Sequence, residues 1–334
     1  MNQIKPIIGI TMGDAAGIGP EVLLKAMEEN EIYNGCLPVI IGDYGVLEYM
    51  ARLINSSFKL RKISNVDDAK FEYGIIDVLD LNNIDLTKLE IGKNSGMCGK
   101  AMLEYAEKGV QLIYESKLHA VIGGPHSKKA VDLAGIEFEG YPNYIAKLTE
   151  CENAFLMLVA ENLRVCNVTL HVPMRVACDM IKKDLVLEAI KAVNDTVKKL
   201  GIENPRLAVA GLNAHAGEEE MFGWEEAEEI EPAIQEAQNI GINAKGPLAG
   251  DSLFYKCLEN KYDAYIGMYH DQAHIALKTL AFEKSSGLVI GTPIIFSTVG
   301  HGSAPDIAGK GIASPGSMIE TIKLVSKLAK NKYE

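Results

Sequence analysis

Short apolar runs alternate with longer amphipathic stretches along the whole chain. A continuous apolar run of about four to eight residues is typical of a buried strand, whereas apolar residues three or four apart are typical of a helix that packs on one face. In the first half of the sequence these patterns predict the strands Lys5–Thr11, Pro38–Gly42, Ile75–Leu79 and Ala120–Gly124, and the helices Gly19–Glu29, Leu47–Leu53 and Cys98–Glu115.

The second half of the sequence repeats this alternation. The predicted strands are Phe155–Val159, Val165–Leu170, Arg206–Gly211, Ala264–Met268, Gly287–Ile290 and Ile294–Ser297, and the predicted helices are Asp184–Leu200, Trp224–Gln238 and Ser317–Lys330. Strands that alternate with helices form crossover units, which build mainly parallel sheets. The pattern therefore predicts an α/β protein with a mainly parallel sheet core.

Composition and charge are those of an ordinary globular protein. Hydrophobic residues make up 48% of the 334 residues and charged residues 23%, which suits a large folded core. The net charge of −12 repels phosphate backbones and argues against a nucleic-acid partner. No apolar stretch approaches the roughly 20 residues that span a membrane. The first residues do not resemble a signal peptide, and the six cysteines form no CxxC pair. We therefore expect a cytoplasmic protein with reduced thiols.

A glycine-rich turn, GDAAGIGPE at residues 13–21, follows the first predicted strand. Glycines let a backbone approach a ligand closely, and the N-terminus of the following helix favours an anion. The turn matches neither the GxGxxG fingerprint nor a Walker loop. It is therefore either a ligand-binding loop or a plain connection between a strand and a helix.

Three histidines share one topological position, because each follows a predicted strand. They occur in the segments LHVPM (His171), GLNAHAGE (His215) and MYHDQ (His270). Ligands gather at the carboxyl ends of parallel strands, and three imidazoles with an open position suit a catalytic divalent metal. A single histidine of this kind is usually structural, but three in equivalent positions predict a shared metal site.

Several motifs in the same order resemble the 4-hydroxythreonine-4-phosphate dehydrogenase family. They are GDAAGIGPE, HVPM, GLNAHAGE followed by FGWEE, GPLAGDSLF, YDAYIGMYHDQ and HGSAPDIAGKG. The motifs cover nearly the whole chain. The resemblance implies a two-domain fold similar to isocitrate and isopropylmalate dehydrogenases, with α/β/α layers. We expect a first domain of residues 1–128 with 298–334, and a second domain of residues 129–297 that carries the metal ligands and the dimer contacts.

The resemblance also implies the cofactors and the chemistry. Such a protein is a homodimer with shared active sites. It binds NAD or NADP and one divalent metal per subunit (zinc, cobalt, manganese or magnesium), through residues that match His171, His215 and His270. A secondary alcohol of a small hydroxy acid is oxidised by hydride transfer, and loss of carbon dioxide then follows. The metal lowers the pKa of the alcohol.

The match extends to individual residues of the site. Asp251 and Lys278 are expected to be catalytic, and Lys278 also contacts the substrate. We expect the cofactor to be bound through Gly13, Asp14, Gly17, Gly19 and Asn213. The acidic run Glu225–Glu231 behind Trp224 is expected to be a solvated helix surface with one packed aromatic ring.

The substrate pocket departs from the family pattern. Tyr141 and Pro142 stand in place of a His-Thr pair, Gly287 in place of an asparagine, and Phe296 in place of an arginine that binds phosphate. Loss of an arginine removes a bidentate anion clamp. We therefore expect an altered substrate-binding set, Tyr141, Pro142, Lys278, Gly287 and Phe296, and a hydroxy acid that depends less on phosphate or carries none.

Three alternatives stay open at this point. One is a true 4-hydroxythreonine-4-phosphate dehydrogenase of vitamin B6 synthesis. Another is a phosphate acyltransferase, which shares the architecture and needs an anion site but no metal. A third is a ligand-binding homologue that has lost catalysis. The retained histidines argue against the last two.

Overall fold

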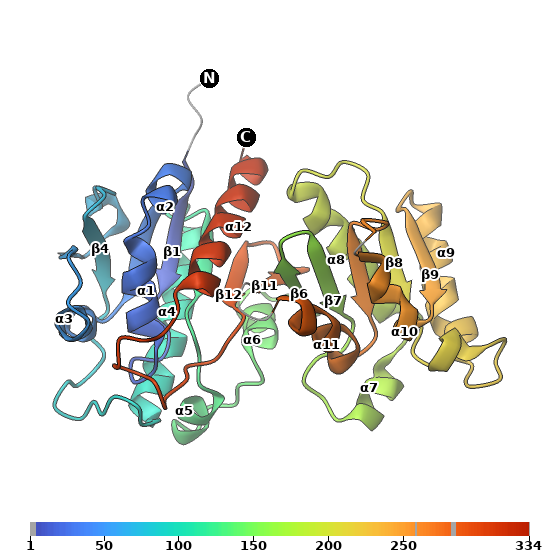
Figure 1. Ribbon diagram of the computed structural model, residues 1–334, viewed down its shortest axis with the longest axis horizontal. Coiled ribbons are helices and arrows are strands. Elements are labelled where there is room, and N and C mark those ends of the chain that lie inside the picture. The colour runs from blue at the N-terminus through green and yellow to red at the C-terminus, as the bar shows by residue number, and fades with distance from the viewer. Residues whose placement is uncertain (1–4, 258, 282–284, 334) are drawn as a thin grey trace. The chain divides into compact units, whose positions relative to one another are not determined.

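The computed structural model describes residues 5–257, 259–281 and 285–333, which divide into two compact units (Figure 1). The first unit is Met1–Glu150 with Ile294–Glu334, and the second is Cys151–Pro293. Each unit is a sheet of mostly parallel strands with helices packed on it. This confirms the mixed α/β fold with mainly parallel sheets that the sequence predicts.

The strands of the first unit are all parallel to their neighbours within that unit. Their side chains are almost entirely buried in β1, β2 and β5, as expected for strands covered on both faces. Their order is β3 (Lys59–Ile63), β4 (Ile75–Asp80), β2 (Leu37–Gly42), β1 (Ile7–Thr11), β5 (Ala120–Gly123) and β12 (Phe296–Val299).

The helices of the first unit pack on this sheet and on one another. Helix α4 contacts β1, β2 and β5, and α12 contacts β5 and β12. The α-helices are α1 (Gly19–Met27), α2 (Asn30–Gly35), α3 (Tyr44–Leu53), α4 (Gly96–Tyr114), α5 (Lys128–Leu133), α6 (Tyr141–Leu148) and α12 (Gly316–Tyr333), with a 3₁₀ turn at Val66–Asp68.

The first unit includes α5 and α6, which the expected domain boundary after residue 128 leaves out. The reason is a small apolar cluster around Met102 and Leu103 of α4 and Val131 of α5. Phe138 and Tyr144 pack against this cluster and tie the connection between α5 and α6 to it.

The second unit combines antiparallel and parallel pairs. Strand β6 is antiparallel to both of its neighbours, whereas β7, β10, β8 and β9 run parallel. The order is β11 (Ser286–Ile290), β6 (Phe155–Ala160), β7 (Leu163–Asn167), β10 (Ala264–Gly267), β8 (Leu207–Ala210) and β9 (Ala244–Leu248).

An apolar core in the second unit joins this sheet to the helix that follows β10. Val165, Tyr265 and Leu277 are among its fully buried members. The α-helices are α7 (Met174–Met180), α8 (Lys183–Lys199), α9 (Glu231–Asn239), α10 (Gly250–Leu253) and α11 (His270–Ala281), with 3₁₀ turns at Ala214–Gly217 and Phe254–Cys257. Among the described residues, no helix is both long and apolar enough to cross a bilayer.

Two strands and several helices differ from the sequence prediction, since the pattern does not predict α2, α5, α6, α7, α10 or α11. The pattern does not reveal β3 and β9, because both lie at sheet edges and carry the charged, glycine and proline residues that edge strands tolerate. The predicted helix Trp224–Gln238 is wrong in detail. A π-helical turn occupies Glu226–Ile230, and the α-helix begins only at Glu231.

The contact between α4 and α5 gives a test of the first unit. A methyl group at Gly99 of α4 would lie 2.2 Å from the backbone carbonyl of Ala130, so we expect Gly99→Ala to destabilise the protein by about 1–3 kcal/mol. Gly35→Ala is the matched control, because its nearest neighbour would be 3.9 Å away and alanine stabilises a helix by up to about 1 kcal/mol. Thermal unfolding measures both changes, and equal unfolding temperatures for the two variants would contradict the prediction.

Candidate functional site

The three histidine segments follow three adjacent parallel strands of the second unit. Strand β10 lies between β7 and β8, with Gly267 opposite Asn167 and Ile266 opposite Val209. The pairing continues past the end of β7, because the Thr169 amide and hydroxyl both donate to the carbonyl of Met268. The carboxyl ends of the three strands therefore meet at one edge, as the sequence analysis expects.

His171 and His270 lie close together at this edge, with ring centroids 5.5 Å apart. Nδ1 of His270 lies 2.7 Å from a carboxylate oxygen of Asp271. That contact favours the tautomer with a proton on Nδ1, which leaves the Nε2 lone pair available to a metal ion.

A third ring, that of His274, supports His270 from one turn further along α11. The two rings are stacked with centroids 3.8 Å apart. Nδ1 of His274 lies within hydrogen-bonding distance of the His270 carbonyl and of the Asn167 amide. Burial lowers the pKa of His274 to about 4, and the neighbouring His270 makes a smaller contribution in the same direction. Its ring is therefore neutral at neutral pH.

His215 belongs to the wall of a cavity in the same unit. Together with Asn213, Asp251, Asp271 and Gln272, it lines this cavity of about 620 Å³, and Leu212, Ala214, Gly250, Phe254, Tyr269, Ile275 and Ala276 complete the lining. In the part of the chain that the structure describes, no three His, Cys, Asp or Glu side chains are arranged to hold a metal ion. One chain thus brings together two of the three predicted ligands.

Gln272 links the two histidine segments at the ends of β8 and β10. Its side-chain oxygen accepts from the amide of Met268 at 2.7 Å, and its side-chain nitrogen donates to the carbonyl of Gly211 at 2.8 Å. The sequence analysis gave no role to this residue. The one sequence feature that could have indicated a role for Gln272 is its position two residues after His270.

Glu226 is a second residue that sequence reasoning missed. The acidic run Glu225–Glu231 is not uniformly solvated, since Glu226 is only 5% exposed. Its carboxylate accepts from the backbone and the side chain of Asn213. The prediction that the ring of Trp224 is packed is also wrong for the single chain, because Trp224 is 61% exposed.

The other predicted residues of the second unit lie on separate elements. Asp251 is an exposed residue of α10 beside the cavity. Lys278 lies two turns after His270 on α11, where its charge helps to lower the pKa of His274. Gly287 is buried in β11 and pairs with Leu158.

In the first unit, the glycine-rich turn packs closely against the chain's own backbone. A Cβ at Gly13 would lie 2.5 Å from the carbonyl oxygen of Pro125, and one at Gly17 would lie 2.6 Å from Ser303. A Cβ at Gly19 would lie 2.3 Å from the Met12 carbonyl oxygen. These glycines are therefore required by internal packing, whatever else they contact.

Asp14 is buried within the same turn. One of its carboxylate oxygens accepts from the amide of Ala16 at 3.0 Å. Burial raises the pKa of Asp14, and the bonds from Ala16 and Ser303 oppose that rise. The predicted cofactor residues of this turn are thus interior rather than exposed.

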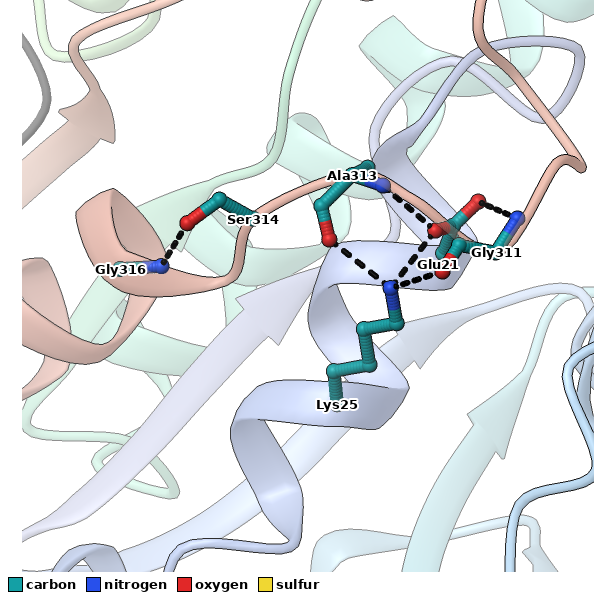
Figure 2. A network of polar contacts seen from close by, with 6 residues as sticks. All are labelled: Glu21, Lys25, Gly311, Ala313, Ser314 and Gly316. Atoms are coloured by element: carbon teal, nitrogen blue, oxygen red, sulfur yellow. Dashed lines mark hydrogen bonds and ion pairs between the residues drawn. The ribbon is translucent and has the colours of Figure 1, made fainter.

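An ion pair between a buried glutamate and a partly exposed lysine connects the helix after this turn to the segment between β12 and α12 (Figure 2). Lys25 donates to Glu21 at 2.8 Å and to the carbonyls of Gly311 and Ala313 at 2.9 Å. Glu21 in turn accepts from the amides of Ala313 and Gly311. The amide of Ile18 also donates to Ser303, so the glycine-rich turn supports residues 303–313.

Tyr141 and Phe296, two expected substrate contacts, belong to a buried aromatic cluster. Their ring centroids are 5.1 Å apart, and His126 lies 5.0 Å from Tyr141. Phe296 is 0% exposed, and both rings crowd the space beside Gly123 at the end of β5. Pro142, next to Tyr141, is also buried in the first turn of α6.

Comparisons with known proteins match this chain to one family over nearly its whole length. A family model described as the pyridoxal phosphate biosynthetic protein PdxA matches residues 34–325. A relative from Clostridium botulinum (strain Langeland), whose name marks it as an inferred D-threonate 4-phosphate dehydrogenase, is 42% identical over 323 residues and 97% of each chain.

Solved structures give the same match in three dimensions. A 4-hydroxythreonine-4-phosphate dehydrogenase from Klebsiella pneumoniae has a TM-score of 0.89 at 33% identity, covering 99% of this chain and 100% of that one. A terephthalate 1,2-cis-dihydrodiol dehydrogenase from Burkholderia xenovorans LB400 has a TM-score of 0.69 at 30% identity, over 97% and 98%. The resemblance found in the sequence motifs, and the isocitrate-dehydrogenase-like fold that it implies, are therefore confirmed.

The ion pair beside the glycine-rich turn can be tested by removing its carboxylate. Glu21→Ala removes the acceptor of two backbone amides, whereas Lys25 keeps the carbonyls of Gly311 and Ala313 as acceptors. We therefore expect a loss of about 1–3 kcal/mol. Glu48→Ala is the control, because Glu48 and Arg52 form an ion pair of the same spacing on an exposed helix face, where such pairs contribute about 0.5 kcal/mol or less. Chemical denaturation measures both losses, and losses of equal size would show that the network does not hold the segment.

Proposed function

We propose a function on one established premise: this chain belongs to the family of the pyridoxal phosphate biosynthetic protein PdxA. The proposed activity is oxidation of the secondary alcohol of a small phosphorylated hydroxy acid, with decarboxylation of the product. The name of the C. botulinum relative supports D-threonate 4-phosphate as the first substrate to test, because the two sequences match over 97% of both chains.

The observation that carries the proposal is the arrangement of histidines at the ends of β7, β10 and β8. His171 and His270 offer two imidazoles 5.5 Å apart between ring centroids, which fits the nitrogen ligands of zinc, cobalt or manganese better than the oxygen ligands of magnesium. We propose that His215 of a second copy supplies the third ligand. When bound, the metal ion supplies a Lewis acid and NAD or NADP supplies a hydride acceptor.

The protein's own residues have distinct proposed roles around that centre. Asp271 orients His270 through the 2.7 Å contact at Nδ1. Asp251, in the wall of the cavity beside His215, is placed to exchange a proton with the substrate. Lys278, on the same helix as His270, provides positive charge for an anionic substrate. Backbone groups of the glycine-rich turn and Asn213 remain the proposed cofactor contacts.

We also propose that the protein acts as a homodimer in the cytoplasm. Large apolar side chains of the second unit are exposed in the single chain, as a dimer surface would require. They include Met174, Val176, Met221, Phe222 and Trp224. The thiols of Cys36, Cys98, Cys166 and Cys178 are free, whereas the side chain of Cys257 lies outside the described part.

A second candidate is a dehydrogenase of a hydroxy acid or diol that carries no phosphate. The buried aromatic cluster around Phe296 favours it, because no cation is presented at that position. The relative named for a terephthalate dihydrodiol, at 30% identity, is also consistent with this candidate. The names of the relatives at 42% identity favour the phosphorylated substrate.

Substrate turnover distinguishes the two candidates. We expect NADH or NADPH to form with D-threonate 4-phosphate and at least about 100-fold more slowly with D-threonate, because a bound phosphate contributes several charge-assisted hydrogen bonds. Absorbance of the reduced cofactor measures both rates, and 4-hydroxythreonine 4-phosphate serves as a third substrate. Equal or faster turnover of plain D-threonate would support the second candidate and overturn the first.

Removal of the metal tests the histidine assignment separately. We expect a chelator to abolish turnover, and added zinc, cobalt or manganese to restore it. His171→Ala and His270→Ala should each weaken metal binding by at least about 100-fold, since loss of a mere supporting contact already costs about 10- to 100-fold. His119→Ala is the control, because His119 accepts a backbone hydrogen bond in the other unit. Calorimetric titration measures the affinity, and unchanged binding by both variants would refute the assignment.

A further inference from the structure

Glu226 is the most deeply buried carboxylate of the acidic run that follows Trp224. Its neighbour Glu228, on the same π-helical turn, is exposed, whereas Glu226 is 5% exposed. A buried carboxylate is costly unless donors surround it. The hydrogen-bond donors that face Glu226 therefore indicate which part of the chain this residue holds in place.

Those donors belong to Asn213, in the segment that leads to His215. One carboxylate oxygen of Glu226 accepts from the Asn213 backbone amide at 2.7 Å, and the other accepts from the Asn213 side chain at 2.9 Å. Glu225 accepts from the same side-chain nitrogen at 2.8 Å. Glu226 thus contacts both the backbone and the side chain of the residue two positions before His215.

Glycines make room for this carboxylate on both sides of His215. A Cβ at Gly211 would lie 2.9 Å from one oxygen of Glu226, and a Cβ at Gly217 would lie 2.9 Å from the other. A Cβ at Gly223 would lie 2.2 Å from the Asn213 side-chain nitrogen. The segment is therefore wrapped closely around the carboxylate.

The backbone of this segment adopts a conformation that it would not adopt without support. His215 and Ala216 have φ values of 52° and 55°, and Glu218, Glu219 and Glu220 continue in the same left-handed region. Side chains other than glycine rarely occupy this region, and a run of them persists only where surrounding contacts hold it. Glu226 binds Asn213, two residues before that run, and lies beside Gly217 within it.

We propose that Glu226 is a positioning residue that fixes residues 211–220 in the left-handed conformation that presents His215 to a metal ion. The proposal rests on the proposed function in one respect, namely that His215 is a metal ligand. Glu226 acts only through Asn213 and the backbone. A group that contacts a metal ligand directly commonly changes metal affinity by about 10- to 100-fold, and for Glu226, which acts through Asn213, we expect a change near the lower end of that range.

The test compares Glu226→Gln with Glu228→Gln in the full-length protein. The first variant keeps the size of the side chain but replaces an accepting oxygen with a donor that faces another donor. The second changes an exposed residue of the same turn. Calorimetric titration with Co²⁺ gives the metal affinity, and amide hydrogen exchange reports on residues 211–220. Thermal unfolding records overall stability.

We expect Glu226→Gln to bind Co²⁺ at least about 10-fold more weakly than Glu228→Gln and to exchange faster within residues 211–220. Unchanged exchange there, or wild-type affinity in a folded Glu226→Gln protein, would overturn the proposal. If Glu226→Gln does not fold, Asn213→Ala replaces it. That variant keeps the backbone bond to Glu226, so the same shifts are expected at a smaller size, and their absence overturns the proposal equally.

His215→Ala separates this proposal from the proposed function. If His215→Ala binds Co²⁺ as the wild type does, His215 is not a ligand, and both the ligand assignment and the proposed presentation of His215 are wrong. If His215→Ala weakens binding but Glu226→Gln does not, the ligand assignment stands and only the positioning role fails.

Discussion

The parallel pairing of β10 with β7 and β8 is the constraint on which the candidate site depends. Parallel neighbours in register end at the same edge of a sheet, so residues far apart in the sequence become neighbours. Backbone and hydroxyl bonds from Thr169 to Met268, and the side-chain bridge made by Gln272, extend this alignment beyond the strands. His171 and His270 meet because their backbones are aligned, not because the rings attract one another.

The interior strands could be predicted from sequence because both of their faces are buried. Ile8, Val121 and Val165 belong to such runs, and their apolar character is sufficient to identify them. Strands β3 and β9 could not be recognised, since an edge strand has one free side and tolerates Lys59 or Pro247. For the histidines, the end of each predicted strand gives the position of the segment along the chain. It does not give the direction in which the histidine ring points.

Burial of charge is the part of the structure that a linear pattern conceals. Glu21 and Glu226 both occur in helices, where a glutamate ordinarily faces water. Each is buried because amides from a remote segment donate to it, those of Gly311 and Ala313 in one case and that of Asn213 in the other. No periodicity in the sequence reports those donors. Only the close approach of two segments creates such an environment, and around Glu226 it is Gly211 and Gly217 that leave room for it.

The aromatic cluster of the first unit limits where an anionic substrate can bind. Phe296 and Tyr141 fill the space at the end of β5, and both rings contact the position where any side chain larger than glycine at residue 123 would lie. A phosphate group moved among these rings would lose its hydration, which is strongly unfavourable unless a cation or several donors replace the lost water. Phe296 therefore contributes an apolar ring and no charge at this position. The phosphorylated substrate that we propose therefore needs its neutralising groups elsewhere, and Lys278 of the second unit, on the helix of His270, is the residue proposed for that role.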